Sequence, residues 1–340
     1  MRIIIPTRNR PTSLSGVLGY YEKFYPDVEI ILADGSDAAF KPLNAKLAAE
    51  ASIEIDYQPY SSDLSLFDRL LEVLKSAPDE YLIMAADDDY PIMETMERAK
   101  HRLEQDPDAV CAGGYLIHID VLDEKNARVR LDPVRQIAPP TAGQRIRLFG
   151  QLPFTTTYAV ARRERLIARY QFLQSWNVPG FFDLGVGMMD MAEGKFIAIP
   201  DLGFICTRNL VHSYYRSEDN MVVLRRGPEV MQLIDKTTAR LQEVDDIDEE
   251  AARRVIGQVV RSRIAALSGV PPARISGFTE RPLYNTERMV RTRADFKSIF
   301  VGGTEQRKKY HEKLAFISES LRATLISQDN AGEGKKYEAL

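Results

Sequence analysis

The chain has 340 residues, with 45 Lys and Arg against 49 Asp and Glu, and this length accommodates one large domain or two smaller ones. Its composition is that of an ordinary globular protein, and no apolar run is long enough to span a bilayer. The apolar start, Met1–Pro6, is shorter than the core of a signal peptide and is typical of a first strand. The two cysteines lie far apart in apolar contexts, so we expect reduced core thiols, no zinc site and a cytoplasmic location.

Charge is distributed unevenly along the chain. Residues 251–340 carry 17 Lys and Arg against 9 Asp and Glu, whereas the rest of the chain is acidic. A basic region favours contact with something anionic, such as the inner face of a membrane, a phosphorylated acceptor or the acidic part of a second subunit. A solvated helical face explains the same charge equally well. We expect no nucleic-acid partner.

Strands and helices alternate over the first 120 residues. Apolar runs of strand length end in turn residues, and between them apolar residues recur at helical spacing. This alternation predicts an α/β fold with a mostly parallel sheet and helices on both faces. The predicted strands are residues 2–5, 28–33, 53–57, 81–86 and 109–119, and the predicted helices are residues 14–24, 44–51, 63–76 and 93–105.

The pattern is less regular up to about residue 215 and helical after it. Residues 123–150 are polar and contain proline, so we expect a loop or lid over the site. The predicted strands are residues 155–161, 196–200 and 202–208, and the predicted helices are residues 163–173, 180–193, 222–240, 248–267 and 307–325. The predicted regions are a domain at 1–215 with halves at 1–120 and 121–215, a helical C-terminal region at 216–326 and a flexible tail at 327–340.

Three consecutive carboxylates, Asp87–Asp89, follow the apolar run Tyr81–Met84. Clustered negative charges repel one another, and burial strengthens the repulsion. A divalent cation held by one or two carboxylates and by substrate phosphates removes this cost. Because open α/β sheets bind ligands at the carboxyl ends of their strands, the run indicates a metal–phosphate site. A solvated acidic turn before Pro91 is the alternative.

Two other loops follow strands that end at the same edge of the predicted sheet. Pro6–Arg10 supplies a hydroxyl, amides and guanidinium groups that suit a nucleotide, and Asp34–Asp37 supplies a carboxylate that suits a base or ribose hydroxyl. A basic surface loop and a helix-capping turn are the structural alternatives. Further along the chain, Asp183 follows Gly180–Phe182, and a carboxylate beside aromatic residues is a candidate general base.

With these motifs the chain resembles the family 2-like glycosyltransferases of the GT-A fold, in particular a bacterial branch that opens on an IPTxNRP loop. The matching residues are Ile5–Pro11, Ala33–Asp37 and Ala86–Tyr90, the last standing for the DxD motif of the family. The resemblance covers about residues 1–215 and is carried by the order and spacing of the motifs. It implies a nucleotide-sugar donor, a UDP-sugar in particular, and Mn²⁺ or Mg²⁺ as the cofactor.

The resemblance also implies roles for single residues. Those implied for donor binding are Pro6, Thr7, Arg8, Asp34, Arg69, Asp87 and Asp88. Those implied for the metal are Asp89, Asp87 and His212. A solvated helix residue and a structural histidine are the alternatives for Arg69 and His212. Inverting members of the family place the base in a Glu-Asp pair, where this chain has Phe182 and Asp183, so Asp183 is the predicted base and Asp190 its rival.

The implied reaction is an inverting displacement on the donor sugar. The metal neutralises charge on the leaving nucleoside diphosphate, and Asp183 takes a proton from an acceptor hydroxyl. The acceptor is expected to be a glycan such as a bacterial surface polysaccharide, a lipid-linked glycan or a protein. A catalytically inactive scaffold of the same fold is one alternative, because the Glu before Asp183 is missing. A sugar-nucleotide nucleotidyltransferase is another, although those enzymes open on a Gly-rich loop.

Apolar residues on the predicted C-terminal helices need a partner surface, which predicts either a homodimer or packing on the first domain. These residues are Val223, Met231, Leu233, Val255, Val259 and Leu267.

Overall fold

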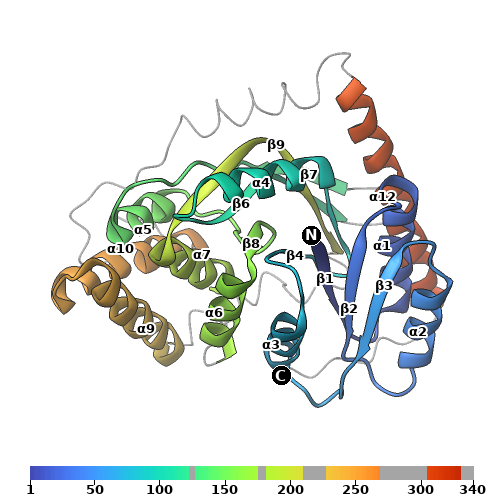
Figure 1. Cartoon of the computed structure of the whole chain (residues 1–340), viewed down its shortest axis with the longest axis horizontal. Coiled ribbons are helices and arrows are strands. Elements are labelled where there is room, and N and C mark those ends of the chain that lie inside the picture. The colour runs from blue at the N-terminus through green and yellow to red at the C-terminus, as the bar shows by residue number, and fades with distance from the viewer. Residues whose placement is uncertain (122–126, 175–180, 210–226, 269–304, 331–340) are drawn as a thin grey trace.

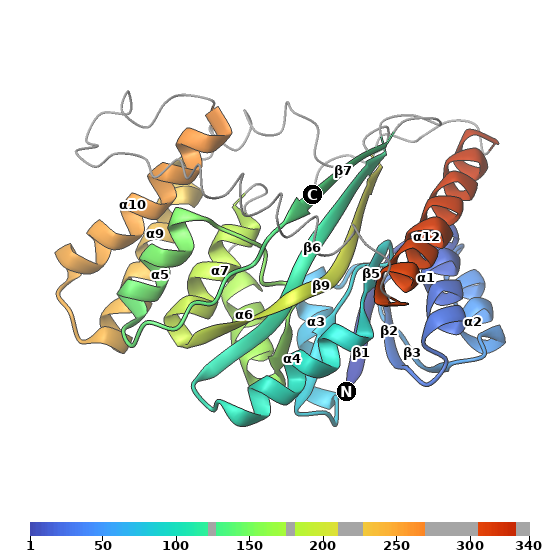
Figure 2. The same ribbon diagram turned by 90° about the horizontal axis from the view of Figure 1, so that it is seen from above.

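The computed structural model describes residues 1–121, 127–174, 181–209, 227–268 and 305–330. It shows an α/β fold in which one curled sheet runs through the molecule between two groups of helices (Figures 1 and 2). The predicted fold class is therefore confirmed.

The strands of the described residues all belong to one sheet. Most of them are short, and only β6 and β9 exceed ten residues. They are β1 (Arg2–Thr7), β2 (Glu29–Asp34), β3 (Glu54–Pro59), β4 (Tyr81–Met84), β5 (Asp89–Pro91), β6 (Ala109–Val121), β7 (Ala127–Asp132), β8 (Val160–Arg162) and β9 (Lys195–Asn209).

The sheet has the strand order β3-β2-β1-β4-β8-β6-β9-β5, with β7 paired to β6. The N-terminal strands β3, β2, β1 and β4 are parallel, as are β6 and β9. Strands β8, β7 and β5 join antiparallel to their neighbours. In the parallel part the residues Ile3–Ile5 are fully buried, and the centre of β1 is accordingly a continuous apolar run instead of an alternating one.

Helices lie on both sides of this sheet. In Figure 2, α12 runs beside α1, and α9 and α10 lie beside α5 and α7 at the opposite end. The helices are α1 (Pro11–Phe24), α2 (Lys41–Glu50), α3 (Leu66–Ser76), α4 (Met93–Gln105), α5 (Ala142–Gln151), α6 (Arg163–Gln174), α7 (Phe182–Glu193), α9 (Gly227–Asp245), α10 (Glu249–Ser268) and α12 (Glu305–Asn330).

The expectation of a loop or lid over residues 123–150 is wrong for much of that range. Residues 127–132 form β7, and residues 142–151 form α5. A charged residue such as Arg145 is typical of an exposed segment, but in α5 it is buried. Its guanidinium donates to the carbonyls of Met191 and Ala192 at the end of α7, at 2.8 and 2.9 Å. These backbone acceptors on α7 offset the free-energy cost of burying the charge of Arg145.

Strand boundaries differ from the prediction at three places. Residues 155–161 were expected to be a strand, but the strand is confined to Val160–Arg162. The two strands expected at 196–200 and 202–208 form one, β9, which accommodates Pro200 through register shifts against β6. The short strand β5, which begins at Asp89, was not expected, because its pairing partner β9 is more than a hundred residues away.

The apolar residues of the C-terminal helices pack largely on the chain itself. Leu233, Val255 and Val259 are buried, whereas Met231 is 48% exposed. Val223 and the side chain of Leu267 lie outside the described residues, as do residues 331–340 of the predicted tail. The homodimer and the domain boundaries stay predictions.

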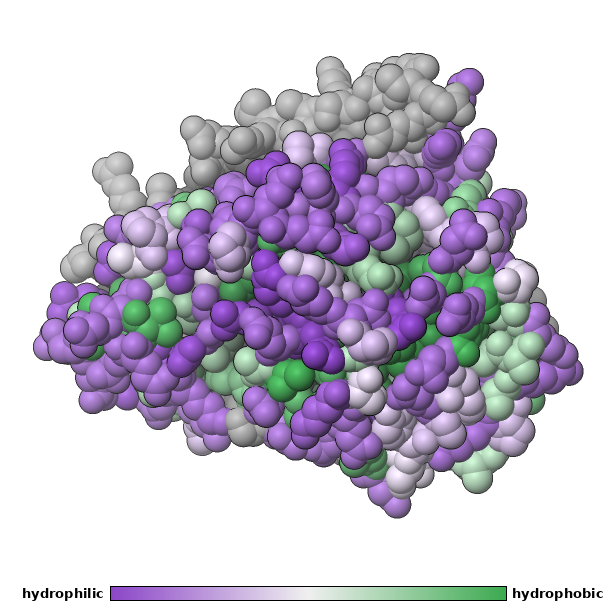
Figure 3. Space-filling view, in the orientation of Figure 1, coloured by the Kyte–Doolittle hydropathy of each residue, from purple (hydrophilic) through white to green (hydrophobic). Residues whose placement is uncertain are grey.

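Hydrophilic side chains cover most of the face seen in Figure 3, and hydrophobic ones show chiefly in gaps between them. No helix within the described residues combines the length and apolar character needed to cross a membrane.

Candidate active site

The carboxyl ends of β1, β2 and β4 bring three predicted site residues to one edge of the sheet. Thr7 and Asp34 are register partners at the ends of β1 and β2. The Thr7 hydroxyl donates to Asp87, which follows β4, at 2.7 Å. The Thr7 carbonyl accepts from the backbone N–H of Gly35 at 3.0 Å. The two predicted loops and the three aspartates therefore share one hydrogen-bonded edge.

Arg10 is the cation at this edge; the sequence predicted it as part of the Pro6–Arg10 loop that suits a nucleotide, but not as the partner of the aspartates. Its guanidinium nitrogens lie 2.5 Å from a carboxylate oxygen of Asp87 and 2.5 Å from one of Asp88. Burial works to lower the pKa of Arg10, but the charges of Asp87 and Asp88 outweigh it and raise the pKa. The repulsion among the three aspartates, which indicated a metal site, is therefore offset in part by Arg10, because two of the three carboxylates already have a cationic partner. The signal for Arg10 was its place directly before Pro11, where the chain turns into α1.

Asp89 differs from its two neighbours, because no ion pair holds it within the described residues. Its side chain accepts from the backbone N–H of Thr207 at 2.9 Å, and the nearby hydroxyl of Tyr158 works to lower its pKa. Burial, followed by the charge of Asp88, raises the pKa of Asp89 to about 8. Burial also raises the pKa of Asp87, with Arg10 opposing it, to about 6. Asp89 is thus the carboxylate that most lacks a counter-charge.

This difference bears on whether the site fits a divalent cation. Within the described residues, no three His, Cys, Asp or Glu side chains cluster tightly enough to form a protein-only metal site. Mg²⁺ is usually bound by one or two carboxylates together with substrate phosphates, so a complete protein cage is not required. A buried carboxylate with a pKa raised to about 8 is a group that a cation would stabilise. Asp89, with Asp88 beside it, fits that arrangement; His212 lies outside the described residues.

Asp34 is fully buried and organises the turn after β2. Its carboxylate accepts from the N–H of Ser36 at 2.8 Å, the amide of Asn44 at 3.1 Å and the hydroxyl of Tyr57 at 2.8 Å. Contact with a ribose would require one of these bonds to be exchanged or a remaining lone pair to be used. Asn44 and Tyr57 were not identified from the sequence, since nothing local links them to Asp34.

Arg69 lies beside the loops at Pro6–Arg10 and Asp34–Asp37. It is 4% exposed, and its guanidinium donates to the Thr7 carbonyl at 3.1 Å. A Cβ at Gly35 would lie 1.6 Å from the Arg69 nitrogen, so only glycine allows this approach. The alternative of a solvated helix residue is therefore wrong. Arg8, by contrast, is about half exposed and lies 3.8 Å from Asp37, and Pro6 is partly buried.

Asp183 lies in the first turn of α7 and is exposed. The hydroxyl of Thr155 donates to its carboxylate at 2.7 Å. The preceding Phe182 stacks on Phe67 of α3, with ring centroids 6.2 Å apart, and this contact ties the start of α7 to the first half of the fold. Burial and the charges of both Asp89 and Asp183 raise the pKa of Tyr158, so the two carboxylates face the same tyrosine.

The rival base, Asp190, is enclosed in the interior. Its carboxylate forms an ion pair with Arg169 at 2.7 Å and accepts from the hydroxyl of Thr156 at 2.5 Å. The side chains of Asp190 and Arg169 are 5% and 1% exposed. A carboxylate held in this way is suited to joining α6 to α7, and it argues for Asp183 as the base.

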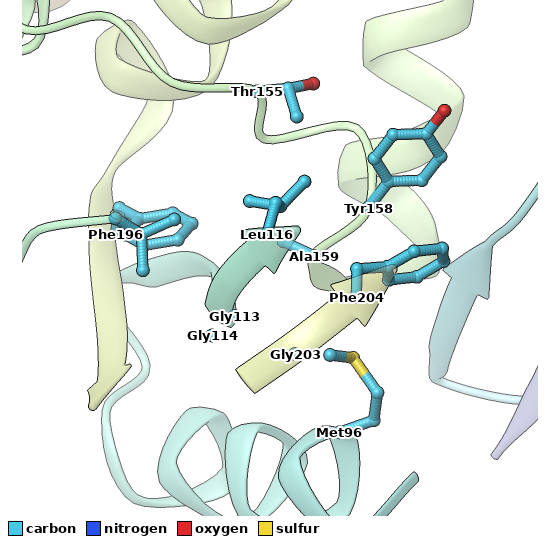
Figure 4. A pocket seen from close by; sticks show the side chains of 11 residues that line it. Met96, Gly113, Gly114, Leu116, Thr155, Tyr158, Ala159, Phe196, Gly203 and Phe204 are labelled. Atoms are coloured by element: carbon cyan, nitrogen blue, oxygen red, sulfur yellow. The ribbon is translucent and has the colours of Figure 1, made fainter. Parts of the chain in front are cut away.

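A small cavity lies against the sheet near Thr155 and Tyr158. Its lining includes Leu116, Phe196, Phe204, Thr155 and Tyr158. In Figure 4 the hydroxyls of Thr155 and Tyr158 lie on the side away from Met96 of α4, with Leu116 of β6 between them and Phe196. Thr155 donates to Asp183, and Tyr158 influences the pKa of Asp89, so the residues that line this cavity lie near both the candidate base and the candidate metal ligand.

No protein-family model and no curated protein matches the chain. Among solved structures, residues 1–349 of TarS from S. aureus match with a TM-score of 0.50 and 13% identity, over 98% of this chain and 93% of that chain. The same TarS fragment in complex with UDP-GlcNAc matches with a TM-score of 0.52, at the same identity and coverage. The mannosyltransferase PcManGT from Pyrobaculum calidifontis, in complex with GDP-Man and Mn²⁺, has a TM-score of 0.45, which is too low to argue from. The chain thus has the α/β fold of the TarS fragment, over nearly its whole length.

Proposed function

We propose that this chain is a glycosyltransferase that moves a sugar from a nucleotide-sugar donor to a hydroxyl of an acceptor. The observation that carries the proposal is the meeting of Thr7, Arg69 and Asp87–Asp89 at one sheet edge. Open α/β sheets bind ligands at such an edge. Support comes from the fold, which is shared with a TarS fragment solved in complex with UDP-GlcNAc.

The donor phosphates are proposed to lie beside Asp88 and Asp89, where Mn²⁺ or Mg²⁺ would neutralise the charge of the leaving nucleoside diphosphate. The loops at Pro6–Arg8 and Asp34 are proposed to hold the nucleoside. Arg69 acts on them as a positioning residue, since its contact is with the backbone of Thr7. A UDP-sugar is the first donor to test.

Asp183 is proposed to accept the proton of the attacking hydroxyl. Its exposed carboxylate leaves room for an acceptor, and its bond to Thr155 fixes its direction. In the displacement the acceptor oxygen forms a bond to the anomeric carbon while the bond to the leaving phosphate oxygen breaks. The proton goes to Asp183 and the electron pair to the phosphate, which gives an inverted product. The acceptor is proposed to be a glycan, a lipid-linked glycan or a protein.

One observation favours a second function, that of a catalytically inactive binding protein. Arg10 occupies Asp87 and Asp88 at 2.5 Å each, so the carboxylates are satisfied in part without a metal. A binding protein of this kind would hold a nucleotide-sugar without metal dependence and without transfer.

The experiment that tests the proposal is a thermal-shift screen against UDP-, GDP-, CMP- and dTDP-sugars, each with and without Mn²⁺. A ligand at a hundred times its Kd stabilises the folded state by about 2.7 kcal/mol. We expect a shift with one nucleotide class that depends on Mn²⁺ and is lost in Asp89→Asn. The matched control is Asp235→Asn on α9, an exposed carboxylate far from the edge in the chain.

A shift that ignores both Mn²⁺ and Asp89→Asn would favour the binding protein. No shift with any nucleotide-sugar would refute the proposal in both its forms.

A further inference from the structure

One row of residues crosses four neighbouring strands and reaches the candidate site. Arg130 of β7 is opposite His118 of β6, His118 is paired with Cys206 of β9, and Cys206 is opposite Asp89 of β5. Paired residues on adjacent strands project from the same face of a sheet. His118 therefore lies on the face that carries Asp89, two strands away from it.

The same face carries the cavity of Figure 4. Leu116 and Phe204, which line that cavity, precede His118 and Cys206 by two residues, and residues two apart in a strand share a face. In Figure 4, Leu116 lies below the segment that bears Thr155 and Tyr158. His118 thus lies two residues further along β6 than Leu116, which lies near Thr155 and Tyr158 in the cavity lining.

His118 is oriented by a carboxylate. Its Nε2 lies 3.0 Å from Asp132 of β7, and Arg130 also pairs with that carboxylate at 3.2 Å. Because a carboxylate only accepts, the Nε2 that faces Asp132 carries the hydrogen, and when the ring is neutral Nδ1 is then a bare acceptor. A carboxylate that fixes the tautomer of a histidine in this way also fixes what the other nitrogen can bind.

Nδ1 of His118 is buried, and no atom of the described residues hydrogen-bonds it. The side chain as a whole is 14% exposed. A buried polar atom without a partner is costly, and native proteins seldom leave one unexplained. The missing partner must be a donor, since Nδ1 accepts. Burial, followed by the charges of Asp89, Asp183, Asp88 and Asp132, raises the pKa of Cys206, which is paired with His118 in the row.

We propose that His118, oriented by Asp132, binds the acceptor. Its Nδ1 accepts a hydrogen bond from a hydroxyl of a sugar-like polyol that lies between His118 and Asp183. This inference rests on the proposed function and assigns the acceptor side of the same site. The hydroxyl bound by His118 is a neighbour of the one that attacks the donor. His118 makes no contact with the donor and moves no proton in the reaction.

The first test observes His118 directly and does not depend on transfer. Protein labelled with ¹⁵N-histidine is titrated with methyl glycosides of glucose, galactose, mannose and N-acetylglucosamine. We expect the unprotonated Nδ1 resonance of His118 to move with at least one glycoside, while His101, exposed on α4, stays unchanged. Absence of movement with every glycoside, or an Nδ1 that carries the hydrogen in the free protein, would overturn the proposal.

The second test separates acceptor binding from a structural role. His118→Gln keeps a donor to Asp132 at the position of Nε2 but loses the acceptor at Nδ1, whereas His118→Asn keeps an acceptor near Nδ1 and loses the bond to Asp132. Losing one neutral hydrogen bond should raise KM for the active glycoside about three- to tenfold. We expect His118→Gln to show this rise with a small change in kcat, and His118→Asn to lie closer to the wild type.

His101→Gln is the matched control, and the affinity for the donor is measured in each variant. A KM unchanged in His118→Gln overturns the proposal. Equal losses in both variants, with a lowered melting temperature, also overturn it, because they assign His118 to the β6–β7 hairpin alone. Failure of the proposed function appears elsewhere, as a lack of donor binding in the wild type.

Discussion

The two sides of the candidate site are built differently. On the side of β1, β2 and β4, each functional side chain is held by several partners, as Asp87 is by Thr7 and Arg10. On the side of α7, Asp183 is exposed, and within the described residues its carboxylate accepts one side-chain hydrogen bond, from Thr155. The first side is a preorganised cradle of charge, and the second is an open position beside it. The difference implies that changes in the cradle affect stability and binding together, whereas changes at Asp183 affect the chemistry alone.

The largest expected effect on the open side of the site is that of Asp183→Asn. The amide keeps the shape of the side chain but cannot accept a proton, and general-base catalysis contributes about 10²–10⁴ in rate. We expect transfer to fall about a thousandfold, while the melting temperature and the affinity for the donor stay near those of the wild type. Transfer assays with separate measurement of donor binding check this, and near-normal turnover would remove Asp183 from the role of base.

Asp190→Asn should have the opposite signature. It leaves Arg169 buried without its charge partner, and breaking a buried ion pair costs about 3–5 kcal/mol. We expect a large loss of stability in urea unfolding. The double variant Asp190→Asn with Arg169→Met removes both charges and should recover part of that loss. If Asp190→Asn instead abolished transfer in a fully stable protein, the two aspartates would exchange roles.

The contrast also explains which parts of the site could be predicted from the sequence. Asp87–Asp89 were identified because a buried apolar strand and the charges after it are adjacent in the chain. Arg10 was missed although it touches two of them, because 77 residues separate it from Asp87 and no local pattern reports such a contact. Tyr158 was missed for the same reason, since its place beside Asp89 depends on how β9 and β5 pair.

The fold shows the same limit. The alternation of strands and helices predicted the class of the sheet and most elements of the first half. The second half was harder because charged residues mark its buried helices. Arg145 and Arg169 are both buried, and each has hydrogen-bond partners on α7. A periodicity argument treats such residues as surface, so α5 was taken for a loop.

Arg10→Gln tests whether the charges on the side of β1, β2 and β4 contribute to stability and to metal binding together. The change frees Asp87 and Asp88 from their cation, and we expect a loss of about 1–2 kcal/mol in stability, less than for a fully buried pair because Arg10 is 44% exposed. Mn²⁺ alone should then stabilise the variant more than the wild type, since the freed carboxylates become available. Arg8→Gln, at an exposed position of the same loop, is the control for both effects.

A wild type that ignores Mn²⁺ beside an Arg10→Gln variant that responds to it would mean that Arg10 replaces the metal. That result would favour the inactive binding protein.

The last expected effect is a pH dependence of stability that originates at Asp89. Burial raises the pKa of Asp89 to about 8, from about 3.9 in an unfolded chain. Between these values the folded protein binds more protons than the unfolded one, so stability is greatest at low pH and decreases as pH rises toward 8. Asp87, with a pKa raised to about 6, adds to the decrease in the lower part of the range. Melting temperatures of the ligand-free protein should therefore fall steadily between pH 5 and pH 8.

Two variants and a ligand decide whether this dependence belongs to the metal position. Asp89→Asn cannot ionise, so it should melt higher than the wild type at pH 8 and lose most of the dependence above pH 6. Asp235→Asn, on the exposed surface of α9, should follow the wild type at every pH. Addition of Mn²⁺ and UDP should stabilise the wild type more at pH 8 than at pH 5, because a cation binds the ionised carboxylate. A thermal shift equal at both pH values would mean that Asp89 does not face the cation, and the metal would then have to be held by Asp87 and Asp88 in competition with Arg10.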